Sequence, residues 1–218
     1  AEARVRDDDR ISIQLADPGV PTGRRIARFV GADGRETIVQ GPERIALTGP
    51  NGVGKTTLLR QLVDDVPAPA PDRARAEALV EHIGYLSQRL DGLDDARTVL
   101  ENVGRAAPEI GTGELRNQLA RLLLRGSSVD RSIGSLSGGE RFRAALATLL
   151  LASPPPRLLV LDEPTNNLDI PSVGQLTEAL ASYRGALIVV SHDRAFLDDL
   201  ELTAELRLDA RGVITRVR

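Results

Sequence analysis

The 218-residue sequence contains no cysteine, methionine or tryptophan, and aromatic side chains make up only 2% of it. The absence of cysteine excludes a disulfide framework, a thiolate metal site and a cysteine nucleophile. With so few aromatic side chains, a buried core must consist of leucine, valine, isoleucine and alanine, which suits helices packed on a parallel sheet. Because 41% of the residues are hydrophobic, we expect one sizeable domain of the α/β class.

Long apolar runs and an excess of basic charge are also missing. No uninterrupted run reaches the roughly 20 residues that cross a bilayer, so the sequence predicts no membrane segment, and the lack of cysteine agrees with a cytoplasmic location. Lysine and arginine number 28 against 31 acidic residues, a net charge of −3, so any nucleic-acid partner must be bound by local patches. The chain begins at Ala1 and lacks methionine, which predicts a fragment of a longer protein.

Hydrophobic periodicity and turn residues divide the chain into strands and helices. Short β-type runs between about residues 10 and 48 predict an antiparallel β subdomain, and helical stretches between about 90 and 150 predict a helical subdomain. Elsewhere, apolar strands alternate with helices, as in a parallel sheet. The expected strands are 11–15, 26–30, 37–40, 45–48, 83–87, 158–161 and 186–190, with a hairpin over 206–217. The expected helices are 55–63, 96–107, 114–124, 138–151 and 173–183.

The segment GPNGVGKT at 49–56 fits the pattern G-x-x-x-x-G-K-[ST] between a strand and a helix. Its glycines let backbone N–H groups point at phosphate oxygens, and the helix that starts at Lys55 adds the positive end of its dipole. Lys55 is expected to reach the β- and γ-phosphates of ATP, Thr56 to bind Mg²⁺ and Thr57 to bind a phosphate nearer the nucleoside. An ordinary glycine turn is the alternative. The predicted nucleotide-binding residues are Gly49, Pro50, Asn51, Gly52, Val53, Gly54, Lys55, Thr56 and Thr57.

Two carboxylates, Asp162 and Glu163, directly follow the apolar strand at 158–161. Ligand sites of α/β proteins form at such strand ends. Asp162 is placed to hold Mg²⁺, and Glu163, one residue further, to orient or deprotonate the attacking water. The alternative is a solvated acidic pair, as at 94–95 and 198–199.

A second phosphate-binding helix start is predicted at 136–140, where the sequence is LSGGE. Alone, this segment fits a simple helix cap equally well. Gln88 follows the strand at 83–87, and His192 follows the strand at 186–190. A lone histidine is more often structural, but the position of His192 at a strand end favours a role in the site.

The order and spacing of these motifs resemble those of the ATP-binding cassette superfamily over nearly the whole chain. The resemblance implies a P-loop NTPase fold: a parallel-sheet core, an antiparallel β subdomain and a helical signature subdomain. It implies Mg-ATP hydrolysis with Glu163 as the catalytic residue, Gln88 at Mg²⁺ and the attacking water, and His192 at the γ-phosphate. It also implies head-to-tail pairing with a second cassette, from the same full-length chain or in a homodimer. The expected interface residues are the signature Ser137, Gly138, Gly139 and Glu140, which face the partner's ATP, and Asp169 of the D-loop.

Two segments resemble the F subfamily, whose members carry two cassettes on one soluble chain and act at the ribosome: DEPTNNLD at 162–169 and SHDRAFL at 191–197. Position 140 also agrees with the F subfamily, because it is glutamate here and commonly glutamine in transporters. Asn167 departs from the usual histidine, and together with LSGGERFRA at 136–144 it resembles the antibiotic-resistance branch from actinomycetes. The interval from Gln88 to Ser137 is too short for a long helical arm and resembles the second cassette. The ribosome or its RNA is then the implied partner of the intact protein.

Other functions remain open at this point. One alternative is the nucleotide-binding subunit of a membrane transporter, and another is a nucleotide-gated binding module with negligible turnover. A third, a DNA-repair ATPase, would need a coiled-coil insertion, which this sequence lacks. The residue that stacks on the base is also open. Phe29 is the one aromatic residue upstream of the P-loop, and a core position fits it better, so an arginine within 24–28 is the alternative.

Overall fold

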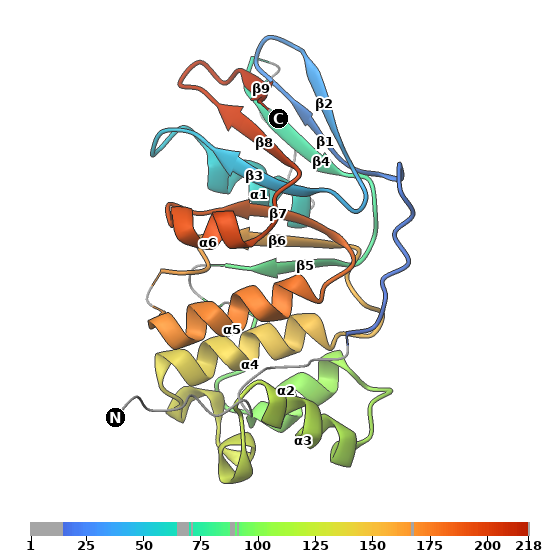
Figure 1. The fold of residues 1–218 in the computed structure, drawn as a ribbon, viewed down its shortest axis with the longest axis vertical. Helices are drawn as coiled ribbons and strands as arrows, with labels where there is room; N and C mark the ends of the chain where they lie inside the picture. Colours follow the sequence, from blue (N-terminus) through green and yellow to red (C-terminus); the bar gives the residue numbers. More distant parts are fainter. Residues whose placement is uncertain are drawn as a thin grey trace, which may run out of the picture.

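A computed structural model describes residues 15–64, 70, 72–87, 90, 92–166 and 168–217. These residues form two sheets and several helices in stacked layers (Figure 1). The larger sheet has the strand order β5-β6-β7-β3-β8-β9 and is parallel except for β9, which runs antiparallel to β8. The smaller, antiparallel sheet has the order β2-β1-β4.

The larger sheet consists of β3 (Arg44–Thr48), β5 (Ile83–Leu86), β6 (Leu158–Asp162), β7 (Ala186–Val190), β8 (Ala204–Leu208) and β9 (Ile214–Arg216). The smaller sheet consists of β1 (Arg25–Val30), β2 (Glu36–Gln40) and β4 (Arg75–Ala78). The helices are α1 (Lys55–Val63), α2 (Val99–Ala106), α3 (Thr112–Arg121), α4 (Gly138–Leu150), α5 (Ile170–Ala181) and α6 (Arg194–Asp199), with short 3₁₀ turns at Gly126–Asp130 and Ile133–Ser135. Among the described residues, no helix is both long and apolar enough to cross a membrane.

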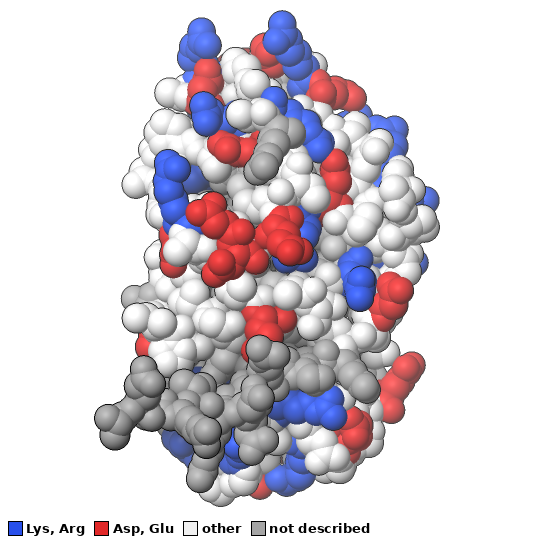
Figure 2. All heavy atoms as spheres, viewed as in Figure 1, with Lys and Arg blue, Asp and Glu red and all other residues white. Residues whose placement is uncertain are grey.

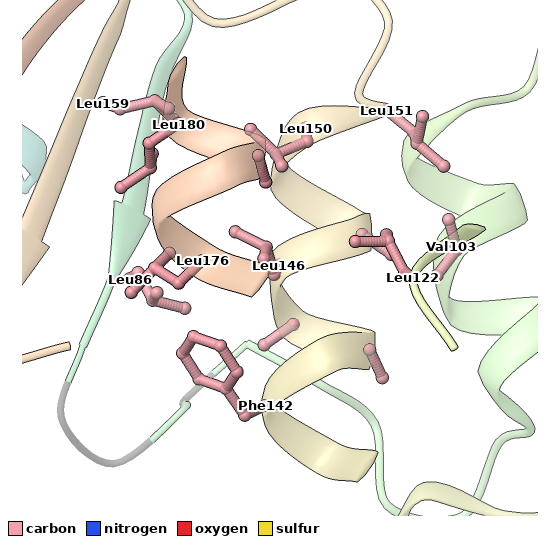
Figure 3. Close-up of a cluster of buried hydrophobic side chains, with 14 of the residues drawn as sticks. Leu86, Val103, Leu122, Phe142, Leu146, Leu150, Leu151, Leu159, Leu176 and Leu180 are labelled. Carbon is pink, nitrogen blue, oxygen red and sulfur yellow. The ribbon is translucent and has the colours of Figure 1, made fainter. Parts of the chain in front are cut away.

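Every residue of β6 and β7 is buried, because helices or the smaller sheet cover both faces of the larger sheet. On one face, α1 packs between the two sheets, and its Leu58 and Leu62 lie in a core with Phe29 of β1. On the other face, α4 and α5 contribute a second core, in which Phe142 and Leu176 pack together with other leucines (Figure 3). The parallel sheet is thus held between two hydrophobic layers.

The antiparallel subdomain differs from the expected range of about residues 10 to 48. Strand β3 pairs in parallel with β7 and β8 and therefore belongs to the larger sheet, whereas β4, which was not predicted, pairs with β1. Strand β4 has the sequence RAEA, without a β-branched or aromatic residue, and forms by pairing with β1 and packing against α1. The expected strand at 11–15 lies, apart from residue 15, outside the described residues.

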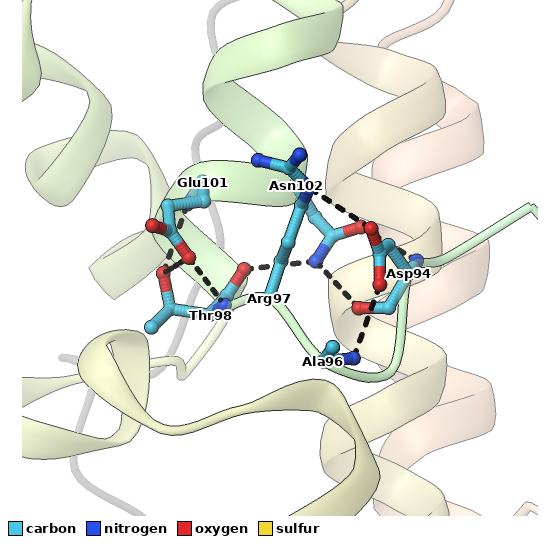
Figure 4. Close-up of polar contacts among 6 residues, drawn as sticks. All are labelled: Asp94, Ala96, Arg97, Thr98, Glu101 and Asn102. Atoms are coloured by element: carbon cyan, nitrogen blue, oxygen red, sulfur yellow. Dashed lines mark hydrogen bonds and ion pairs between the residues drawn. The ribbon is translucent and has the colours of Figure 1, made fainter.

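A hydrogen-bonded turn leads from β5 into the helical subdomain (Figure 4). The buried side chain of Asn102 accepts from the N–H of Asp94 at 2.8 Å and donates to the carbonyls of Asp94 and Thr98 at 3.1 and 2.9 Å. Thr98 and Glu101 form a capping box at the start of α2. The N–H of Ile133 donates to the carbonyl of Arg97, so this turn also anchors the segment that leads into α4.

We predict that Asn102→Ala lowers the free energy of unfolding by about 2 kcal/mol, because it leaves buried backbone groups without their partners. Urea denaturation measures this change. The matched control is Asn117→Ala, which removes an exposed asparagine of α3 and should change stability by less than about 0.5 kcal/mol. Equal effects of the two substitutions would contradict the structural role of Asn102.

Candidate nucleotide-binding site

The P-loop connects β3 to α1 and depends on glycine at its two ends. Gly49 has a φ of 143°, and a Cβ there would lie 2.2 Å from the carbonyl oxygen of Leu208. Gly54, the residue before α1, has a φ of 106°. Both backbone conformations disfavour any other residue, so the loop curls tightly around the start of the helix. The free N–H groups and the positive end of the α1 dipole therefore point into the same space.

Lys55 is the only lysine in the sequence, and its side chain is buried at 8% exposure. Its Nζ donates to the carbonyl oxygens of Gly49 and Pro50 at 2.8 and 3.0 Å. The two carbonyls hold the ammonium group under the loop without neutralising its charge. This positive cradle fits an anionic phosphate group.

Asp162 is the last residue of β6 and is 5% exposed. The hydroxyl of Tyr85 on β5 donates to its Oδ2 at 3.4 Å. Burial, followed by the charge of Asp162, raises the pKa of Tyr85, so the phenol remains a hydrogen-bond donor at neutral pH. A buried carboxylate at a strand end, close to the hydroxyl-bearing start of α1, fits a Mg²⁺ site.

Glu163 and His192 are in direct contact. Glu163 has a φ of 50°, and its N–H donates to the carbonyl oxygen of Val190 at 2.8 Å. One carboxylate oxygen accepts from the backbone N–H of His192 at 3.2 Å, and the other lies 3.2 Å from its Nε2. The Glu163 side chain is 13% exposed and that of His192 is 62% exposed. A left-handed glutamate costs about 1 to 3 kcal/mol, and such strain is typical of functional sites.

A pocket of about 450 Å³ joins these elements. It is lined by Asn51, Gly52, Gly54, Lys55, Thr56, Thr57, Asp162, Glu163, Asn166, Val190 and His192. The structure thus brings most of the predicted P-loop, the two carboxylates and the histidine into one cavity. A neighbouring pocket of about 460 Å³ shares Lys55 and His192 and includes Gly49. The predicted Gln88 lies outside the described residues.

The segment at 136–140 is a capped helix start on the surface. Ser137 is the N-cap of α4, and it forms a capping box with Glu140. Ser137 and Gly138 are exposed, and neither they nor Gly139 line the two pockets. In this chain the segment is therefore available to another molecule and does not reach its own P-loop pocket.

Asp169 is also exposed and is the N-cap of α5, where its carboxylate accepts from the N–H of Ser172 at 3.0 Å. The Ser172 hydroxyl and N–H, with a smaller contribution from Arg143, lower the pKa of Asp169. A Cβ at Gly139 would lie 3.7 Å from both Arg143 Nη1 and Ser172 Oγ. The starts of α4 and α5 are therefore neighbours, and Arg143 of α4 lies between them.

A family model described as ABC transporter matches residues 36–166, which is more than half of the chain. The chain belongs to this family. Its relatives include the ATP-binding protein Uup from Haemophilus influenzae. The two sequences are 41% identical over 167 residues, which cover 75% of this chain and 25% of Uup. ABC transporter F family member 5 from Arabidopsis thaliana is 41% identical over 162 residues, covering 72% of this chain and 22% of that protein. The mouse ATP-binding cassette sub-family F member 3 is 37% identical over 175 residues, 80% of this chain and 24% of that protein.

This ABC domain spans about a quarter of the length of these relatives. Among solved structures, it resembles a bacterial Atm1-family ABC exporter with ATP bound, with a TM-score of 0.69 and 21% identity over 93% of this chain and 41% of the exporter. It also resembles a metal-chelate type ABC transporter in an inward-facing conformation, with a TM-score of 0.67 and 21% identity over 88% of this chain and 83% of that one. These likenesses confirm the expected P-loop NTPase fold.

The candidates for a base-stacking residue, Phe29 and an arginine within 24–28, lie in β1 or directly before it. Phe29 is completely buried in the core of the β subdomain, as the alternative to a stacking role predicts. The backbone carbonyl of Arg24 accepts from the N–H of Gly41 at 2.8 Å, just before β3 begins, whereas the P-loop follows the opposite end of β3. Arg28 forms ion pairs with Glu77 and Glu36. Arg24 and Arg25 form no such ion pair among the described residues, so an arginine within 24–28 stays a prediction for the stacking role.

Sequence reasoning missed two features of the site. Tyr85 was not singled out, although its place on a strand beside the Asp162 strand could have indicated a contact. The contact between Glu163 and His192 was also missed, because it depends on the pairing of β6 with β7, which the sequence does not specify.

We predict that Lys55→Ala weakens ATP binding about 100-fold, because it removes the charge-assisted contacts to the phosphates, worth about 3 kcal/mol. Isothermal titration calorimetry measures the affinity. Arg211→Ala, which removes an exposed arginine (84% exposed), serves as the control and should leave binding unchanged. Because Lys55 is the only lysine, ATP should also protect it selectively from an amine-reactive reagent, as read by mass spectrometry. Unchanged affinity or no protection would contradict the phosphate-binding role.

Proposed function

We propose that this ABC domain binds ATP with Mg²⁺ and hydrolyses it at a site that a second ABC domain completes. One observation carries the proposal: a single pocket contains the P-loop, the buried Asp162 and the strained Glu163. The pocket offers positive charge on one side and carboxylates on the other. ATP hydrolysis requires both, because the phosphates must be neutralised and a water molecule must be activated.

Residues of the P-loop side bind and orient the substrate. Lys55 and the N–H groups at the start of α1 face the negative charge of the β- and γ-phosphates. Thr56 and Asp162 are the residues that would hold Mg²⁺, which supplies further charge neutralisation when it is bound. Gly52, Gly54 and Val190 also line the pocket.

Glu163 acts as the base that orients the attacking water and accepts its proton. The contacts from His192 fix the direction of the carboxylate, and the left-handed backbone holds the side chain toward the pocket and away from bulk solvent. His192 itself is mostly exposed and can therefore reach a γ-phosphate from the pocket rim. A positioned base of this kind contributes about 10²- to 10⁴-fold to a rate.

The second ABC domain supplies the missing wall of the site. Ser137 and the glycines that follow it form an exposed helix start, with free N–H groups and the positive end of the α4 dipole, remote from the pocket of their own chain. Head-to-tail pairing would place this helix start over the γ-phosphate of the partner. One ABC domain therefore provides half of each of two sites.

We predict that Glu163→Gln abolishes turnover, by about 100-fold or more, and preserves ATP binding, because the amide keeps the shape of the side chain but cannot accept the proton. Phosphate release and calorimetry on the paired protein measure the two quantities. The control is Glu109→Gln at an exposed position before α3. Near-normal hydrolysis in Glu163→Gln would remove this residue from the catalytic role.

The composite site also predicts how activity depends on concentration. The isolated 218-residue chain should show a turnover per molecule that rises with protein concentration, because only paired domains have complete sites. Light scattering at each dilution reports the fraction of dimer. Brisk hydrolysis by solutions that contain only monomer would contradict a shared site.

For the intact parent protein, we propose action on the ribosome, with the closed, ATP-bound pair of ABC domains as the binding state. The F-subfamily segments at 162–169 and 191–197 support this, as do the relatives named as F-family members. Figure 2 shows acidic side chains gathered around α6 and the start of β8, where Asp198, Asp199 and Glu201 are exposed. Contacts with phosphate backbone are therefore expected on other surfaces and in the rest of the parent protein.

Within the F subfamily, we propose that this domain is the second cassette of a cytoplasmic protein of the antibiotic-resistance type, which protects the ribosome. Asn167, the LSGGERFRA segment and the short interval between Gln88 and Ser137 support it. This assignment predicts that cells expressing the parent protein need a higher concentration of a ribosome-targeting antibiotic to stop their growth.

We predict that carboxylate-to-amide changes at Glu163 and its counterpart in the other cassette trap the parent protein on ribosomes in the presence of ATP. Hydrolysis normally ends the closed state, so its loss should prolong binding. Sucrose-gradient sedimentation at several salt concentrations measures the bound fraction, which should fall as salt rises. Recovery of the trapped protein in membrane fractions, and none with ribosomes, would replace this proposal with the transporter function.

A further inference from the structure

Tyr85 lies directly beside the strand that ends in the metal-binding carboxylate. In the parallel pairing of β5 with β6, Tyr85 is opposite Val160. Asp162 comes two residues after Val160 and therefore points to the same face of the sheet. This is the face that α1 covers, because Val160 and Tyr85 both pack with the leucines of α1. The phenol and the carboxylate are thus aimed at the space beneath the P-loop helix.

The Tyr85 hydroxyl donates to Asp162 Oδ2 at 3.4 Å. No other side chain among the described residues forms a hydrogen bond with the Asp162 carboxylate. Asp162 is 5% exposed, so solvent offers little competition for its oxygens. A donor on Oδ2 favours one orientation of the carboxylate, and no other side chain of the described residues is hydrogen-bonded to Oδ1.

Arg60 follows Thr56 by four residues on α1, so the two side chains lie on the same face of the helix, one turn apart. Thr56 and Asp162 both line the nucleotide pocket. The metal-site candidates Thr56 and Asp162 therefore meet at the start of α1, and Arg60 lies one turn further along the same helix.

We infer that Tyr85 is a positioning residue that orients the Asp162 carboxylate toward the Mg²⁺ of MgATP. The inference rests on the proposed function, because it assigns Mg²⁺ to Thr56 and Asp162. Metal-site residues commonly depend on such an outer hydrogen bond, and its loss weakens metal binding about 10- to 100-fold. The long 3.4 Å contact places Tyr85 at the lower end of that range.

The test compares the affinity for ATP with Mg²⁺ and with EDTA, because the ratio of the two measures the contribution of the metal site. Tyr85→Phe should reduce this ratio about 10-fold and leave the affinity in EDTA unchanged. The sequence contains only two tyrosines, and the other one gives a matched control. Tyr183 is buried and donates to the carbonyl oxygen of Pro156 at 2.8 Å, so Tyr183→Phe should leave the ratio unchanged.

A double-mutant cycle separates a positioning role from a general effect on the site. Asp162→Asn should remove most of the Mg²⁺ contribution. In that background, Tyr85→Phe should have no further effect, because the group that it orients is already lost. Additive effects of the two substitutions would show that Tyr85 acts independently of Asp162 and would overturn the inference.

A second measurement leaves Tyr85 in place and so does not depend on the folding of Tyr85→Phe. In Tyr183→Phe, incorporated 3-fluorotyrosine reports from position 85 alone. Its ¹⁹F signal in the ATP complex should shift when Mg²⁺ is added, and this shift should disappear in Asp162→Asn. A signal that does not respond to Mg²⁺, or an unchanged affinity ratio in Tyr85→Phe, would overturn the inference. Failure of the wild-type chain to bind ATP at all would instead refute the proposed function.

Discussion

The parallel pairing of β6, β7 and β3 is the constraint on which the rest of the site depends. Asp162 pairs with Val190, and Ala46 with Val189, so the three strands end at one edge of the sheet. The segments that follow these strands are the two carboxylates, the histidine and the P-loop. Residues far apart in the sequence therefore meet at the ends of these strands, where Glu163 contacts His192, and the hydrophobic layers on both faces maintain this arrangement.

The sheet edge supports local conformations that would be unfavourable in isolation. Gly49 lies so close to the carbonyl of Leu208 that a side chain would not fit there, and Glu163 adopts a left-handed backbone conformation. Within the part of the chain that the structure describes, the Lys55 ammonium donates only to carbonyl groups of its own loop. Each feature costs free energy, and the packed strands offset it. The pocket is therefore arranged by the fold for charged ligands.

The sequence predicted what depends on local pattern and residue chemistry. The all-apolar runs of β6 and β7, the helix after the P-loop and the carboxylates at the end of β6 were all identified, and the family comparison confirmed the ABC domain. Strand β4 and helix α6 were not predicted, because RAEA has little strand propensity and α6 is only six residues long. The contacts of Glu163 with His192 and of Tyr85 with Asp162 depend on strand order, which composition and periodicity do not encode.

The placement of the remaining predicted residues supports the proposal that a second ABC domain completes the site. Ser137 opens α4 and Asp169 opens α5, and Arg143 lies between the two helix starts. Next to Asp169, Ile170 is 89% exposed, an unusual position for a large apolar side chain. The capped start of α4 and an exposed apolar residue thus share one surface outside the nucleotide pocket. Pairing with a second domain would bury the isoleucine and place the helix start at a phosphate, so hydrophobic and electrostatic contributions would favour the same complex.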